Sequence, residues 1–317
     1  MKKLLSLSGS FLTIMILAAL ILSSCATGPS PAELIRAQEQ WNLEQMDLWR
    51  SFGFVKKEVQ VDSDRIVYMD GGQGETVLLL HGFACNKEYR SFFAKYLTGE
   101  YHVVIPDLPG FGESTKRHEE NYTIDNQMKR FGRFANALGL ERFHLAGNSM
   151  GGTIAAVYAA KNLRRISTLA LLDPWRLKTT KAGKSEMEAI DCLGIRSAGE
   201  MEKCDPYFFV KPPPSTEVFK KAFVAQAIAA KGYNEQILWQ LFKEDFALEP
   251  FLPMIQAPVC IIWGDQDRIC DVSGASVLEK GLKNHQTIIL KDTGHFPMIG
   301  KPAETAEAYV NFLKNHS

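Results

Sequence analysis

Residues 143–152 read Phe-His-Leu-Ala-Gly-Asn-Ser-Met-Gly-Gly, a short apolar run that leads into a Gly-x-Ser-x-Gly motif. The run predicts a buried strand, and residues 153–161 predict a helix directly after it. A serine on such a strand-to-helix turn is exposed as a nucleophile, and glycines flank it because the sharp turn leaves no room for Cβ atoms. The motif alone is weak evidence. Its place between a strand and a helix makes Ser149 a candidate nucleophile.

Short apolar runs recur on both sides of this motif, with helical segments between them. A hairpin is expected at residues 55–61 and 65–70, and strands at 76–80, 102–106, 143–146, 167–172 and 258–263. Near-continuous hydrophobic runs are typical of parallel strands that are buried on both faces. The alternation therefore predicts an α/β fold with a mostly parallel, doubly wound sheet.

One long segment interrupts this alternation. Residues 174–253 lack a strand pattern but carry helical patterns at 216–230 and 235–246, which predicts an inserted helical cap. We expect a signal peptide at 1–24, a tether and helix at 25–50, the two parts of the core at 51–173 and 254–317, and the cap between them. The cap carries seven aromatic residues, most of which we expect to pack its own core: Phe208, Phe209, Phe219, Phe223, Trp239, Phe242 and Phe246.

The catalytic groups that Ser149 needs follow in a fixed chain order. Leu80-His-Gly-Phe83 ends an earlier strand, so the amides of Phe83 and Met150 are candidate oxyanion donors. His81 is expected to be structural, because the base comes last in this order. Asp292-Thr-Gly-His295 follows residues 287–290, which makes His295 the candidate general base. Nucleophile, acid and base thus run Ser, Asp, His.

Four aspartates compete for the role of acid. Asp173 precedes Pro174 and is expected to shape the chain's exit from the sheet. Asp265 suits a bond to amides of its own turn, and Asp271 suits an N-cap. Asp267 lies on the far side of the turn, where a carboxylate reaches back to Nδ1 of His295. Asp267 is therefore the predicted acid.

Several motifs resemble the α/β-hydrolase superfamily over residues 55–317. The sequence Asp107-Leu-Pro-Gly-Phe-Gly-Glu-Ser114 is similar to a loop motif of that family, and residues 122–130, 262–267 and 271–275 resemble bacterial lipases and membrane-associated monoacylglycerol lipases. The resemblance implies a Ser149–His295–Asp267 triad that cleaves acyl esters without a cofactor. An apolar cap and a membrane tether favour lipid-derived esters, such as monoacylglycerols or short to medium acyl esters. A C–C bond hydrolase, an aminopeptidase and a non-catalytic binding lipoprotein remain alternatives.

The first residues are typical of an export signal. Lys2 and Lys3 precede an apolar stretch, and Leu22-Ser-Ser-Cys25 resembles the lipobox of bacterial lipoproteins, in which the cysteine is lipidated. Cleavage before Cys25, with Ala26 beside it, predicts a lipid-anchored protein at the periplasmic face of the outer membrane. The alternative is an ordinary secretory peptide. The helix expected at residues 32–50 is predicted to pack on the protein rather than on the bilayer.

Composition limits the remaining possibilities. The 317 residues carry 36 Lys+Arg and 36 Asp+Glu, so no basic surface for nucleic acid is expected. Six cysteines are too few for a disulfide scaffold, but Cys192 and Cys204 both fall in the cap and are predicted to pair in an oxidising compartment. Cys260 is expected to be a buried thiol. The other histidines lack metal-ligand spacing, so no metal site is expected. Oligomeric state is left open.

Overall fold

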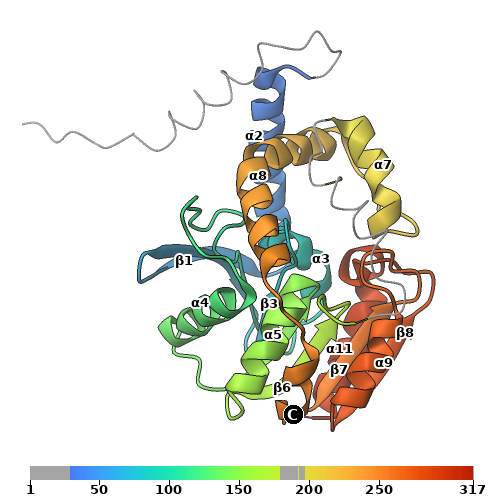
Figure 1. Cartoon of the computed structure of the whole chain (residues 1–317). Coiled ribbons are helices and arrows are strands. Elements are labelled where there is room, and N and C mark those ends of the chain that lie inside the picture. Colours follow the sequence, from blue (N-terminus) through green and yellow to red (C-terminus); the bar gives the residue numbers. More distant parts are fainter. Residues whose placement is uncertain (1–28, 179–191, 193–196, 317) are drawn as a thin grey trace, which may run out of the picture.

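A computed structural model describes residues 29–178, 192 and 197–316, and it contains an eight-stranded sheet in the order β1-β2-β4-β3-β5-β6-β7-β8 (Figure 1). The strands are β1 (Phe54–Val61), β2 (Asp64–Gly71), β3 (Thr76–Leu80), β4 (His102–Pro106), β5 (Phe143–Asn148), β6 (Ile166–Leu172), β7 (Val259–Gly264) and β8 (His285–Leu290). The β1–β2 hairpin pairs antiparallel with β4, and β4, β3, β5, β6, β7 and β8 run parallel. The predicted doubly wound sheet is confirmed.

Both faces of the sheet are covered, which explains the continuous apolar runs. In β3, Leu78 packs with Phe131 on one face, whereas Val77 packs with Tyr309 on the other. Because neighbouring side chains of a strand alternate between faces, both sets of positions must be apolar here. The helices that flank the sheet are η1 (Lys87–Arg90), α3 (Ser91–Ala94), α4 (Ile124–Ala137), α5 (Met150–Lys161), α9 (Ser273–Gly281), α10 (Pro297–Gly300) and α11 (Pro302–Lys314).

Between β6 and β7 the described residues form the helices α7 (Ala198–Phe208), α8 (Glu217–Lys243) and η3 (Glu249–Met254). The helical patterns expected at 216–230 and 235–246 both fall in one continuous helix, which ends at Lys243. Gly232 lies inside α8, and a glycine there costs about 1 kcal/mol relative to alanine. The helix nevertheless continues because Asn234, Ile237 and Leu241 bury the next turns against the core.

The N-terminal helix α2 (Pro31–Ser51) runs beside α8 (Figure 1). Ser30 and Glu33 form a reciprocal capping box that starts the helix. Leu34 of α2 packs with Val224 of α8, and Trp41 meets Phe219 with ring centroids 4.9 Å apart. The expectation that this helix packs on the protein is confirmed. Within the part of the chain that the structure describes, no helix combines the length and apolarity needed to cross a membrane.

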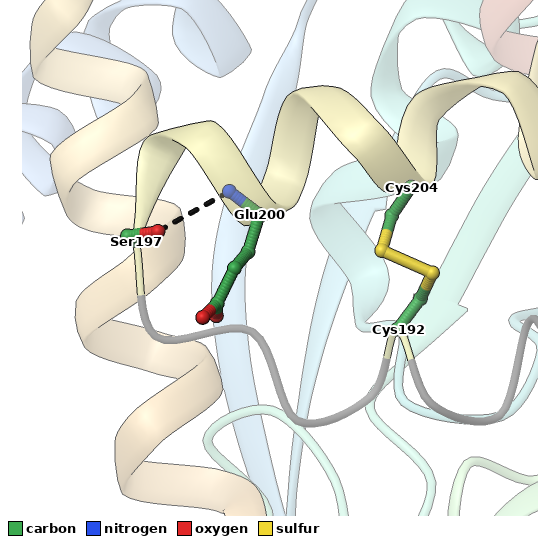
Figure 2. The surroundings of a disulfide bond; sticks show 4 residues. All are labelled: Cys192, Ser197, Glu200 and Cys204. Carbon is green, nitrogen blue, oxygen red and sulfur yellow. Dashed lines mark hydrogen bonds between the residues drawn. A yellow bond between two sulfur atoms is a disulfide. The ribbon is translucent and has the colours of Figure 1, made fainter.

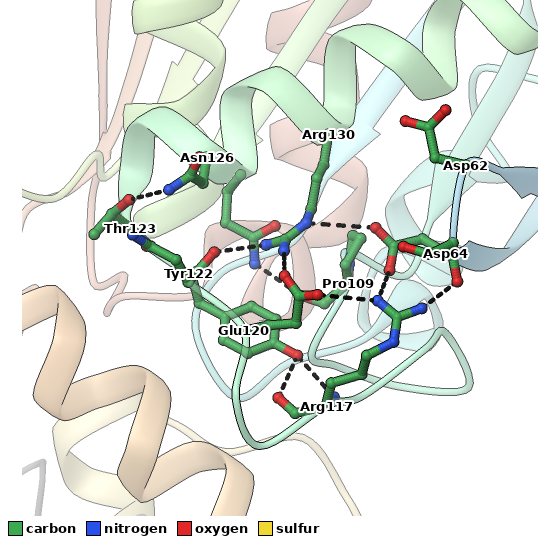
Figure 3. A network of polar contacts seen from close by, with 12 residues as sticks. Asp62, Asp64, Pro109, Arg117, Glu120, Tyr122, Thr123, Asn126 and Arg130 are labelled. Carbon is green, nitrogen blue, oxygen red and sulfur yellow. Dashed lines mark hydrogen bonds and ion pairs between the residues drawn. The ribbon is translucent and has the colours of Figure 1, made fainter.

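A polar network joins the β1–β2 hairpin to the loop before α4 (Figure 3), and Gln240 extends it to the cap. Arg117 and Arg130 both bind Asp64 at the start of β2, at 2.9 and 3.4 Å, and Arg130 also binds Glu120. Gln240 of α8 donates to the carbonyl of Glu120 at 2.9 Å and accepts from the amide of Tyr122. The cap helix is thus held to the core through backbone groups of the 117–122 loop.

The predicted pairing of Cys192 with Cys204 is confirmed (Figure 2). The bond joins residue 192 to the second turn of α7, which begins after the N-cap Ser197. Ser197 Oγ accepts from the amide of Glu200 at 3.2 Å. Cys260 is a buried thiol in β7, as expected, and burial raises its pKa to about 12.

Candidate active site

Ser149 occupies the turn between β5 and α5, with a left-handed φ of +54°. The turn brings backbone segments so close that side chains are excluded around it. A Cβ on Gly147 would lie 2.3 Å from the carbonyl oxygen of Gly151, and one on Gly151 would lie 2.4 Å from that of His81. The glycines predicted from the motif are therefore required by contact.

His295 and Asp267 lie together, although 28 residues separate them. Nδ1 of His295 donates to Oδ2 of Asp267 at 2.8 Å, and both side chains are almost completely buried. The other carboxylate oxygen, Oδ1, accepts from the amides of Ile269 and Cys270 at 2.7 and 3.0 Å. Because Nδ1 carries the proton, Nε2 of His295 is left as the basic nitrogen.

The other three candidate aspartates accept hydrogen bonds from backbone amides. Asp265 accepts from the amide of Thr293 at 3.1 Å, so it braces the loop that carries His295 rather than its own turn as expected. Asp271 accepts from the amide of Ser273 at 3.0 Å in the turn before α9, but the N-cap of that helix is Val272, so the predicted N-cap role is wrong. Asp173 is completely buried and accepts from the amide of Gly264 at 2.9 Å.

Asn148 connects the serine turn to the histidine loop. Its Nδ2 donates to the carbonyls of Leu172 and His295, both at 3.1 Å, and its Oδ1 accepts from Arg90 at 3.4 Å. Asn148 is not among the predicted site residues, because the Gly-x-Ser-x-Gly motif does not fix the side chain before the serine. A polar residue that ends an apolar strand was the available signal.

The loop after β3 lies against Ser149. A Cβ on Gly82 would be 3.2 Å from Cβ of Ser149, which places the neighbouring amide of Phe83 beside the serine. The amide of Met150 is at the first position of α5, where N–H groups have no partner within the helix. Both predicted oxyanion donors therefore come from backbone that adjoins the serine.

His81 holds this loop in place and is not a base. Nδ1 donates to the carbonyl of Gly82 at 2.7 Å, and Nε2 accepts from the amide of Leu108 at 2.9 Å. Burial lowers the pKa of His81 to about 4, so the ring is neutral at pH 7 with both nitrogens in use. The structural role expected for His81 is confirmed.

A buried ion pair joins the segment after β3 to the loop after β4. Nζ of Lys87 binds Asp107 at 2.9 Å and Glu113 at 2.7 Å, and Asp107 also accepts from the amides of Lys87 and Glu113. Burial favours the neutral amine, but the carboxylates of Asp107, Glu88 and Glu113 raise the pKa of Lys87 above its usual value. The motif at 107–114 is therefore a structural clamp.

The end of α7 packs on the histidine loop. Phe208 stacks on Phe296 with ring centroids 5.3 Å apart, and Phe209 tilts against the same ring at 5.7 Å. A Cβ on Gly294 would be 2.4 Å from the carbonyl oxygen of Phe208. The expectation that most cap aromatics pack inside the cap holds only in part. Phe208, Phe219 and Phe223 pack against the cap cluster, whereas Phe246 packs on the main core and Trp239 and Phe242 are exposed.

Among the described residues, Asp267, Cys270 and His295 form a group with metal-ligand atoms within 4.8 Å of one another. Asp267 and His295 already bind each other, and the second carboxylate oxygen accepts two amides. The atoms of Asp267 and Nδ1 of His295 that could bind a metal ion are therefore already hydrogen-bonded within the acid–base pair and its turn. Cys25, the predicted lipidation site, lies outside the described residues.

The sheet order, the strained serine after β5 and the acid–base pair after β7 and β8 define an α/β hydrolase. Residues 75–213 match the family model described as the alpha/beta hydrolase fold, and the chain belongs to that family.

Proteins that are similar over most of this chain define its class more narrowly. The chain is similar to Lipase 1 of Psychrobacter immobilis, with 30% identity over 93% of this chain and 94% of the lipase. It is also similar to human monoacylglycerol lipase ABHD6, with 31% identity over 76% of each chain. A solved membrane phospholipase A matches with a TM-score of 0.83 and 36% identity, over 96% of this chain and 97% of that one. The protein is a carboxylic ester hydrolase, and the family resemblance found in the sequence is confirmed.

Proposed function

We propose that the protein hydrolyses lipid-derived carboxylic esters, such as monoacylglycerols or short to medium acyl esters, through an acyl-enzyme on Ser149. The observation that carries the proposal is the buried 2.8 Å contact between His295 Nδ1 and Asp267 Oδ2, on a loop that Asn148 ties to the serine turn. The named lipases and monoacylglycerol lipase among the relatives support the substrate class.

The chemistry follows from these groups. His295 Nε2 takes the Ser149 proton as Oγ attacks the ester carbonyl, while Asp267 keeps the ring oriented and stabilises the imidazolium. The amides of Phe83 and Met150 donate to the oxyanion. His295 then protonates the leaving alcohol, and water repeats the sequence to release the acid. The protein groups in these steps are the side chains of Ser149, His295 and Asp267 and the two backbone amides.

Covalent labelling tests the nucleophile. An active-site fluorophosphonate should modify Ser149 in the wild type, and Ser149→Ala should abolish both labelling and ester hydrolysis. A matched control, Ser91→Ala, removes a serine that bonds the carbonyl of Glu88 and should leave labelling intact. Wild-type protein that is folded but unlabelled would favour a non-catalytic lipoprotein.

Substrate profiling tests the reaction class. Monoacylglycerols and nitrophenyl esters of graded chain length should be cleaved faster than ring-cleavage products and aminoacyl amides. Preference for the ring-cleavage products would identify a C–C hydrolase, and preference for the amides an aminopeptidase.

We also propose that Cys25 anchors the protein to the periplasmic face of the outer membrane. Leu22-Ser-Ser-Cys25 supports this, and the capping box at Ser30 starts α2 five residues later. Cys25→Ser should leave an uncleaved or soluble protein that still hydrolyses soluble esters. Wild-type protein that partitions into the aqueous phase of a detergent extraction contradicts the anchor, and fractionation of the two membranes tests its location.

A further inference from the structure

The acid of the triad, Asp267, has a second buried aspartate, Asp173, beside it. Asp173 follows β6 and Asp267 follows β7, and these strands are parallel neighbours with Leu172 paired to Ile262. The amide of Asp173 donates to the carbonyl of Ile262 at 3.1 Å, and the residue takes a left-handed φ of +45°. The end of β6 is therefore fixed against β7, and the carboxyl group of Asp173 is held inside the sheet edge.

The carboxyl group of Asp173 is incompletely satisfied if it is ionised. Its Oδ1 accepts from the amide of Gly264, but Oδ2 is buried without a donor among the described residues. Asp267 acts on Asp173 both through its charge and through a hydrogen bond between the two carboxyl groups. Two buried carboxylates in contact do not both ionise, so one proton is shared by this pair.

The donors decide which carboxyl group carries that proton. Asp267 accepts from two amides and from the imidazole of His295, whereas Asp173 accepts from one amide. Hydrogen bonds to a carboxylate stabilise its ionised form, so Asp267 is the anion. Burial, followed by the charge of Asp267, raises the pKa of Asp173 well above its usual value.

The charged groups around the pair agree with this assignment. Asp173 is influenced by Asp267 from the loop after β7 and by Arg90 from η1, and His295 approaches Asp267 from the loop after β8. Arg90 favours ionised Asp173, but it donates to the carbonyl of Leu80 and to Asn148. Oδ2 of Asp173 has no hydrogen-bond partner among the described residues, so Arg90 does not supply the missing donor.

We propose that Asp173 is a positioning residue that remains protonated at neutral pH and donates a hydrogen bond to Asp267, which extends the triad to Ser149–His295–Asp267–Asp173. The inference rests on the proposed function of Ser149 and deepens it. The proton stays on Asp173 throughout the reaction. This fourth donor disperses the charge of the Asp267 carboxylate and fixes that carboxylate toward Nδ1 of His295.

The test compares three variants by the pH dependence of kcat/KM. In Asp173→Asn the amide oxygen still accepts from Gly264 and the amide nitrogen donates to Asp267, so the acid limb should match the wild type. In Asp173→Ala the donor is lost, and the acid limb should rise by about 0.5–1 pH unit. Asp271→Asn, which alters only the bond to Ser273, should match the wild type.

Two further measurements do not depend on folding of the alanine variant: activity at alkaline pH and the infrared spectrum. Wild-type activity should fall as Asp173 ionises, whereas Asp173→Asn should keep its activity to higher pH. Because burial raises the pKa of Glu88 to about 7, that group contributes to both spectra, and the readout is the infrared difference spectrum, wild type minus Asp173→Asn, at pH 7. It should show the carbonyl stretch of one protonated carboxyl group.

Three results would overturn the inference: absence of that band, identical alkaline limbs in wild type and Asp173→Asn, or an Asp173→Asn variant as inactive as Asp267→Asn. Fluorophosphonate labelling of the same samples separates the two proposals. Unlabelled wild type contradicts the proposed function, whereas labelled wild type with any of the three results contradicts only the role of Asp173.

Discussion

The side-chain amide of Asn148 donates to the backbone carbonyl of His295 at 3.1 Å, across 147 residues of sequence. The same amide binds the carbonyl of Leu172, so one side chain joins the ends of β5 and β6 to the histidine loop. The distance between nucleophile and base therefore depends on a residue that does not take part in proton transfer.

Replacing Asn148 with leucine should slow catalysis more than it unfolds the protein. The carbonyl of His295 loses its donor, which costs about 1–3 kcal/mol, whereas the carbonyl of Leu172 keeps the amide of Ser149; the histidine loop thereby gains freedom. We expect kcat to fall by about tenfold, measured with a soluble ester beside thermal unfolding. Asn162→Leu is the control, because it removes a bond to the carbonyl of Tyr158 at the far end of α5. Equal kcat losses in both variants would contradict the link.

Asp267→Asn should remove most activity from a folded enzyme. An asparagine amide facing Nδ1 favours the wrong imidazole tautomer, so kcat should drop by about 10³- to 10⁴-fold. Asp265→Asn should instead lower stability, because Asp265 braces the loop through the amide of Thr293. Single-turnover kinetics with circular dichroism would separate the two effects. The assignment is wrong if Asp265→Asn is the inactive variant while Asp267→Asn retains most activity.

His81 should make the fold sensitive to acid. Its pKa is about 4 in the folded protein and about 6.5 when unfolded, so the unfolded chain binds more protons between these values. Stability from this residue is complete above about pH 6.5 and is lost as pH falls toward 4, by up to about 1.4 kcal/mol per pH unit. Urea unfolding at several pH values should show a shallower slope for His81→Gln than for wild type. Parallel slopes would assign the acid sensitivity to other groups.

Lys87→Met should be among the most destabilising single substitutions away from Ser149. It leaves Asp107 buried without its cation, which costs about 3–5 kcal/mol. Lys57→Met is the matched control, because the Lys57–Asp70 pair is half exposed and such pairs contribute at most about 1 kcal/mol. The two midpoints in guanidinium chloride give the comparison, and similar shifts would contradict a buried clamp.

The sequence predicts the central parallel strands well because they are buried apolar runs, and the turns after β5 and β7 begin with polar residues of the site. Ser149, Asp267 and His295 could be found this way, since parallel strands bring their carboxyl ends to one edge. Asn148 and Asp173 could not be assigned, because their roles depend on strands that only the folded sheet makes adjacent. The unbroken course of α8 through Gly232 likewise depends on burial of later residues.

The contact between Trp41 of α2 and Phe219 of α8 affects how an anchor-free enzyme should be prepared. A shortened protein that starts at β1 would lack Leu34 and Trp41 of α2. The apolar side chains of Val224 and Phe219 in α8, which these two residues cover, would then be exposed. The exposed apolar surface would favour aggregation of such a protein. The cap would also lose the helix that packs against α8. An engineered cleavage site or affinity tag therefore belongs between Cys25 and Ser30, so that the capping box and the whole of α2 stay with the enzyme.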